Sequence, residues 1–217
     1  MRIRTFTVGV ALVLALVGGA ALSACASPTG SASASTETTD AVGTPMPAAS
    51  APPEQVPGST LSADQVTAAV PHGQTLAVVV AADADEQQSV AVAAIETFAA
   101  AHGSVVQVFA DAASADAVDR ALASGPDVVV GVGPEVTGAV DLASASNLDV
   151  RFLVLGSQLA EPTGNVIAVV WPGADERAVF AEEAQQLSGA EEYARAAIET
   201  GLAAFASGLD GHVIRLG

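Results

Sequence analysis

The sequence predicts an α/β domain built on a single doubly wound, parallel sheet of five to six strands. First, Val-rich segments of strand length alternate with Ala-rich segments of helical length from residue 75 onward. Second, several Val-rich segments are apolar at every position, which is typical of strands buried on both faces. Third, Gly or Pro stands at several junctions between these segments. Such alternation favours one parallel sheet with helices on both sides.

The expected strands are short apolar runs. Residues 75–82 (TLAVVVAA) and 127–132 (DVVVGV) are apolar on both faces, which favours central places in the sheet. Residues 156–165 lack a helical pattern and interrupt the alternation. The expected strands are residues 75–82, 104–110, 127–132, 150–155 and 166–170, with 212–216 as a last short strand.

The expected helices have amphipathic patterns or recognisable ends. Residues 86–102 place Ile95 and Phe98 on one face, and Gly103 ends the helix. Pro134 occupies a favoured first helical position. The expected helices are residues 63–69, 86–102, 114–124, 134–146, 174–187 and 191–207.

Serine residues are the expected caps of three of these helices. Ser62 precedes the first helix, which Pro71 would stop, and Ser114 begins the third. Ser188 and Glu191 have the spacing of a capping box at the start of the last helix.

The first 24 residues have the pattern of a secretory signal. Arg2 and Arg4 supply the positive end, residues 5–22 are uncharged and largely apolar, and Leu-Ser-Ala precedes Cys25. This pattern resembles the lipobox of bacterial lipoproteins. The resemblance implies that Cys25 receives diacylglycerol and becomes the N-terminus, so that acyl chains, palmitate among them, anchor the protein to the extracytoplasmic face of the cell membrane. The alternative is an uncleaved signal anchor, for which residues 5–22 are short against a span of about 20 residues.

A linker separates this signal from the folded domain. Residues 25–60 are mostly Ser, Thr, Ala, Pro and Gly. Such a segment buries too little apolar area to offset its ordering entropy, so we expect a disordered tether. Residues 61–217 then form the α/β domain.

Composition excludes several classes of function. The chain of 217 residues has 7 Lys+Arg against 24 Asp+Glu, a net charge of −17. Loss of the two signal arginines leaves 5 − 24 = −19. Nucleic acid is therefore not an expected partner, because phosphates need clustered cations. One Cys and three His exclude an internal disulfide and a Cys/His zinc cluster, so we expect neither metal nor cofactor.

Candidate binding residues follow the expected strands. Ligands of doubly wound sheets bind beyond the carboxyl ends of the strands. Eight residues at those ends are the predicted ligand-binding set: Asp83, Asp85, Asp111, Gly133, Glu135, Ser157, Gln158 and Trp171.

Each group in this set has two interpretations. The carboxylates would accept hydrogen bonds from ligand hydroxyl or amino groups, or hold a cation; alternatively they are acids favoured by helix N-termini. Trp171 is a stacking platform for a ligand or a cap on the sheet end. Gly133 permits the turn into the next helix, and Glu135 opposes a phosphate there. The chain holds no G-x-S-x-G and no H-E-x-x-H motif, so we expect no enzyme.

Three segments carry a family resemblance: PDVVVGVGPE (126–135), NLDVRFLVLG (147–156) and NVIAVV (165–170). Their order resembles the first lobe of type 1 periplasmic binding proteins, nearest to the basic membrane protein (nucleoside-receptor-like) lipoproteins of ABC importers. The resemblance implies a flavodoxin-like sheet, a small-molecule solute and a membrane transporter as partner.

Only about 46 residues follow Trp171, too few for a second lobe of equal size. A partner or second copy would then close the site. We expect a lipid-anchored solute-binding protein or a derivative of one. The alternative is a non-catalytic envelope protein-interaction module that has lost small-molecule binding.

Overall fold

Seven parallel strands form one sheet in the computed structural model, which describes residues 56–174 and 186–217. Their order across the sheet is β1-β7-β6-β5-β4-β2-β3. The α/β class is confirmed, with seven strands where five to six were expected. The strands are β1 (Thr60–Ser62), β2 (Thr75–Val79), β3 (Val105–Phe109), β4 (Val128–Val132), β5 (Arg151–Leu155), β6 (Val166–Val170) and β7 (Val213–Arg215).

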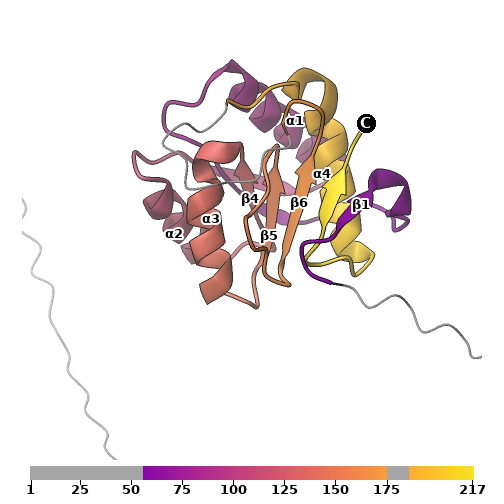
Figure 1. Cartoon of the computed structure of the whole chain (residues 1–217). Helices are drawn as coiled ribbons and strands as arrows, with labels where there is room; N and C mark the ends of the chain where they lie inside the picture. Colours follow the sequence, from indigo (N-terminus) through magenta and orange to yellow (C-terminus); the bar gives the residue numbers. More distant parts are fainter. Residues whose placement is uncertain (1–55, 175–185) are drawn as a thin grey trace, which may run out of the picture. The chain divides into compact units, whose positions relative to one another are not determined.

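Helices cover both faces of this sheet. Counted along the chain, the first and fourth α-helices pack in one hydrophobic core against one face of the sheet. The second and third α-helices pack in another core against the opposite face (Figure 1). This is the doubly wound arrangement that the alternation predicts. The helices are α1 (Glu86–His102), α2 (Ser114–Ala123), α3 (Pro134–Ser146) and α4 (Ala190–Ala206), with a short 3-10 helix η1 (Ala63–Gln65) after β1.

Alternate side chains of each central strand enter opposite cores. Along β4, Val128 and Val130 pack toward α1 and α4, whereas Val129 packs toward α2 and α3. All three are at most 1% exposed. Each buried Val stabilises the fold by about 1.5–3 kcal/mol relative to an exposed one. Burial on both faces is therefore the physical reason for the unbroken apolar runs in the sequence.

The strand order reverses next to β2. From β2 the chain crosses to β3 on one side, then returns to β4 on the other and continues outward through β5 and β6. This order is that of flavodoxin-like sheets, in which ligands bind beyond the carboxyl ends of the strands where the order reverses, here β2 and β4.

The first expected helix, residues 63–69, is wrong. Within these residues the chain forms only the three-residue η1, which directly follows β1. Thr60 pairs with Val213 of β7, and the Gly58 N–H donates to the Gly211 carbonyl at 2.7 Å. β1 therefore pairs with β7 at the edge of the sheet, directly before η1. These contacts place Gly58 and Thr60 in the folded domain, although the predicted domain began at residue 61.

Two expected caps are also wrong. The N-cap of α2 is Ala113, with no side-chain cap, and Ser114 is the first helical residue. The N-cap of α4 is Gly189 at φ 71°, again without a side-chain cap. Ser188 instead donates its hydroxyl to the Gly173 carbonyl.

Other expected elements agree with the structure. Helices 86–102 and 134–146 and strand 166–170 coincide with α1, α3 and β6 residue for residue. Of the expected helix 174–187, the described residues are not helical, and 175–185 lie outside the described ranges.

The predicted signal and nearly all of the predicted linker lie outside the described ranges too. Within those ranges, no helix combines the length and apolar character needed to cross a bilayer.

Candidate functional site

Two helices begin where the strand order reverses. Asp85, after β2, is the N-cap of α1: its carboxylate accepts from the Gln88 N–H at 2.8 Å, and the Gln88 side-chain oxygen accepts from the Asp85 N–H at 3.0 Å. This reciprocal pair is a capping box. After β4, Gly133 is the N-cap of α3.

Gly133 allows the side chains of Glu135 and Gln88 to approach the backbone closely. Its φ is 85°, a conformation that L side chains rarely adopt. A Cβ at this position would lie 2.8 Å from Glu135 Oε2 and 2.9 Å from Gln88 Nε2. The sequence predicts that Gly133 permits the turn into the next helix, and the structure contains that turn.

Gln88 links the two helix starts. Its Nε2 donates to Glu135 Oε2 at 2.8 Å and to the Val132 carbonyl at 3.4 Å. Its side chain is nearly enclosed, with the residue 2% exposed. Gln88 was not among the predicted site residues, although the spacing Asp85-x-x-Gln88 carried a capping-box signal that would have found it.

Glu135 lies in a strongly acidic environment. Partial burial raises the pKa of Glu135, and the negative charges of Asp85 and Asp83 raise it further, against a lowering backbone hydrogen bond. The charges of two other predicted carboxylates, Asp85 and Asp83, therefore act on Glu135 at this edge of the sheet. Such a group favours hydrogen-bond donors and cations, and it opposes anions.

Asp111 is engaged elsewhere. The Arg120 Nη1 atom contacts both carboxylate oxygens of Asp111, at 2.7 and 3.0 Å. The same guanidinium lies 5.6 Å from the ring centroid of Phe109. This local ion pair between the end of β3 and α2 neutralises Asp111, so we do not place it with the other three carboxylates.

Ser157 and Gln158 follow β5 and are buried, at 1% and 9% exposed. Both have interactions within the described part of the chain. They stay predicted binding residues at the end of a strand that neighbours β4.

Trp171 is fully buried at 0% exposed. Its Nε1–H donates to the Ser188 carbonyl at 2.7 Å, and its ring stacks on Tyr193 with centroids 6.1 Å apart. A Cβ on Gly156, at the end of β5, would lie 3.0 Å from the indole. The geometry is that of a cap over the sheet end, so we leave Trp171 out of the proposed solute site.

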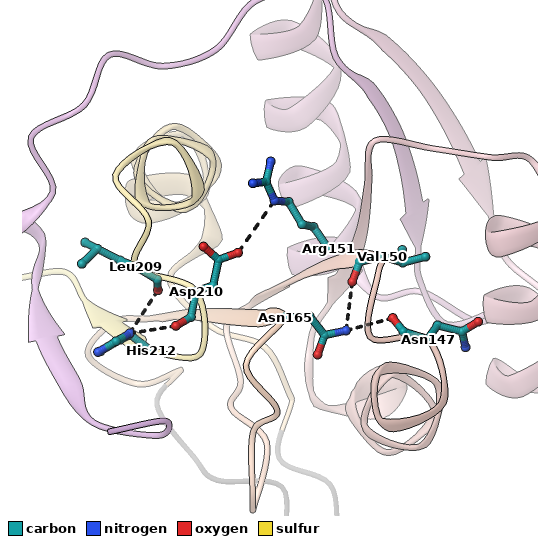
Figure 2. Close-up of polar contacts among 7 residues, drawn as sticks. All are labelled: Asn147, Val150, Arg151, Asn165, Leu209, Asp210 and His212. Carbon is teal, nitrogen blue, oxygen red and sulfur yellow. Dashed lines mark hydrogen bonds and ion pairs between the residues drawn. The ribbon is translucent and has the colours of Figure 1, made fainter. Parts of the chain in front are cut away.

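The opposite edge of the sheet carries a separate polar network (Figure 2). The Asn165 amide donates to the carbonyls of Asn147 and Val150 at 3.0 and 2.9 Å, which holds the turn between α3 and β5. Arg151 pairs with Asp210 at 3.7 Å. Asn165, which belongs to one of the family-like segments, therefore supports the fold.

All three histidines lie toward this same edge, away from the acidic site. His72 precedes β2, His102 ends α1 and His212 precedes β7. The His212 Nδ1 atom lies 3.2 and 3.1 Å from the carbonyls of Leu209 and Asp210 (Figure 2). Within residues 56–174 and 186–217, no group of three or more His, Cys, Asp and Glu residues is placed to hold a metal ion.

No protein-family model matches the chain, and no curated protein matches it. Among solved structures, it is similar to an ABC transporter solute-binding protein from Conexibacter woesei DSM 14684, with 22% identity, a TM-score of 0.37, and coverage of 45% of this chain and 35% of that one. It is also similar to ABC transporter solute-binding proteins from Aeropyrum pernix K1, with 16% identity, a TM-score of 0.39, and coverage of 46% and 29%.

The matched part thus spans about a third of those chains.

Proposed function

We propose that this protein is a lipid-anchored bacterial lipoprotein, resembling one lobe of an ABC-transporter solute-binding protein, that binds a small solute without catalysis. One observation supports it most: Asp83, Asp85 and Glu135 follow strands that meet where the strand order reverses, and the charges of Asp85 and Asp83 raise the pKa of Glu135 there. Sheets of this class bind ligands at that point.

The solute that fits this edge carries hydroxyl or amino donors. Carboxylates only accept hydrogen bonds when ionised, and three of them attract positive charge. Gln88 already uses its side-chain amide on Glu135 and Val132, so it holds the carboxylate in place. The start of α3 would by itself favour an anion such as phosphate. The three carboxylates outweigh this effect, so a polyhydroxyl or amino solute suits the site better than a phosphate does.

A thermal-shift screen of residues 50–217, which retain β1, would test the proposal against nucleosides, sugars and amino acids. A ligand at 100 times its Kd adds about 2.7 kcal/mol of stability. We expect Glu135→Gln and Asp83→Asn to reduce the shift of any true ligand. Asp149→Asn removes the same charge near the start of β5, at the opposite edge, and is the matched control. An equal effect of all three variants would contradict the site.

The membrane anchor is a separate proposal from Arg2, Arg4, residues 5–22 and Cys25. Two acyl chains on Cys25 would hold the domain at the membrane, whereas one would bind only reversibly. Mass spectrometry of the N-terminal peptide would test lipidation. Cys25→Ser is expected to move the protein from the membrane fraction to the soluble fraction. Retention of Cys25→Ser in the membrane would favour an uncleaved anchor.

An envelope protein-interaction module is the second candidate. The side chains of Trp171 and Leu187 fill the space over Gly156, which reduces the room for a solute at the end of β5. Edge strand β3 exposes Val105 and Val108, at 57% and 43%. A silent ligand screen together with specific capture of a transporter subunit or another envelope protein would favour this function.

A further inference from the structure

Two histidine rings lie side by side at the edge of the sheet opposite the acidic site. The ring centroids of His72 and His102 are 4.9 Å apart, with the planes at 46°. His72 lies in the loop before β2, and His102 is the last residue of α1. The pair lies near the amino ends of the strands, whereas the proposed solute site lies at their carboxyl ends, so the two sites are independent.

The ring of His102 is held in a defined orientation. It stacks on Phe98, which is 1% exposed, with centroids 4.1 Å apart. The His102 Nδ1 atom lies 2.9 Å from the Phe98 carbonyl oxygen. Because a carbonyl only accepts, Nδ1 carries the proton, and Nε2 of the neutral ring keeps a lone pair. Metal-binding histidines commonly have this backbone hydrogen bond.

His72 is held next to that ring by its neighbour. The Gly73 N–H donates to the His102 carbonyl at 3.1 Å, and Gly73 has φ 69°. This bond fixes the loop against the end of α1. The side chain of His72 remains exposed.

We propose that His72 and His102 form a two-imidazole site for a divalent transition-metal ion of the Zn²⁺, Ni²⁺ or Cu²⁺ class. Two ring nitrogens at about 2.0–2.1 Å from a tetrahedral ion put the ring centroids about 5 Å apart. The observed centroid separation of 4.9 Å is compatible with this spacing. Imidazole nitrogen is a suitable ligand for these ions, whereas Mg²⁺ and Ca²⁺ prefer oxygen ligands.

The surroundings add to the preference for a cation. His102 ends α1, and the C-terminus of a helix carries partial negative charge. The chain has a net charge of −17, which concentrates cations near it. In the described part of the chain no third His, Cys, Asp or Glu joins the pair, so water completes the coordination.

The test titrates the full chain, without a polyhistidine tag, with Ni²⁺, Zn²⁺ or Cu²⁺ against a chromophoric chelator. His72→Gln and His102→Asn are each expected to weaken binding about tenfold or more, because loss even of a hydrogen-bond partner of a metal ligand weakens binding about tenfold. In His102→Asn, the amide nitrogen keeps a donor for the Phe98 carbonyl and Nε2 is lost. His212→Asn is the matched control and should bind like the unchanged chain.

A second measurement distinguishes one imidazole from two. With Cu²⁺ bound, nitrogen couplings in electron paramagnetic resonance should report two imidazoles, and each variant should lose one. Circular dichroism would verify that His72→Gln, a change in an exposed loop, retains the fold. Unchanged affinity in either variant, or coupling to one imidazole only, would overturn the two-imidazole site while leaving the proposed solute site unaffected.

Discussion

Gln88 donates a hydrogen bond from Nε2 to Glu135 Oε2 at 2.8 Å and thereby joins the start of α1 to the start of α3. The two residues are 47 positions apart in the chain. The same side chain caps its own helix through Asp85. One buried amide thus orients the acidic group that the proposed solute would contact.

Replacing Gln88 with Glu should destabilise the protein. The variant keeps an acceptor for the Asp85 N–H but loses the donor to Glu135 and adds a nearly buried carboxylate. Loss of one buried partner costs about 1–3 kcal/mol, and more where a charge is involved. Urea denaturation would measure the free energy of unfolding, with exposed Gln107→Glu on β3 as the control. A change equal to the control would contradict the role of Gln88.

Glu135 should make stability depend on pH. Its pKa is raised above 4.5 in the folded state, by burial first and then by Asp85 and Asp83. The folded protein therefore binds a proton more tightly than the unfolded chain does. This contribution to stability is fully present below the unfolded pKa and is lost as pH rises through the folded pKa.

Unfolding free energies of the wild-type chain and Glu135→Gln, measured across mildly acidic to neutral pH, would show this effect. The wild type should lose stability relative to Glu135→Gln as pH rises. The pKa of Asp141 is also raised, by burial and by Glu161. Asp141 makes the same pH-dependent contribution in both proteins, so it cancels in the difference between their unfolding free energies. A difference that is constant with pH would show that the pKa of Glu135 is not raised.

Two glycines in helices should respond oppositely to Ala. At Gly201 in α4, a Cβ would lie 2.4 Å from Leu153 Cδ1, so Gly201→Ala should cost about 1–3 kcal/mol by overpacking. At Gly138 in α3, a Cβ would meet no atom within 4 Å, so Gly138→Ala should stabilise by about 0.5–1 kcal/mol. Thermal unfolding of both variants checks the signs. Stabilisation by both would indicate that α4 packs less closely on β5.

The single tryptophan gives a direct test of its own position. Trp171 is 0% exposed, so its fluorescence should be blue-shifted and poorly quenched by iodide in the folded protein. Unfolding in urea should restore red-shifted, quenchable emission. Strong quenching in the folded state would favour the alternative in which the indole serves as an open stacking platform.

The sequence predicted the ends of a helix correctly where the end depends on the backbone preference of a residue at that position. Gly103 ends α1 at φ 64°, and Pro134 starts α3, as expected from their own backbone preferences. That Asp83 and Asp85 come near Glu135 was predicted, because all three follow strands whose carboxyl ends share one edge; that they bind a solute stays a prediction. Gln88 was missed because its partner comes from another element.

The sequence by itself determined the α/β class, the central strands and the acids at their ends, since apolar runs and turn residues act over a few positions. Only the tertiary structure decided that residues 60–62 join the sheet, that Trp171 is a buried cap, and that Arg120 neutralises Asp111. These outcomes depend on pairing and packing between separate elements. Their energies outweigh local propensity and leave no periodic signal along the chain.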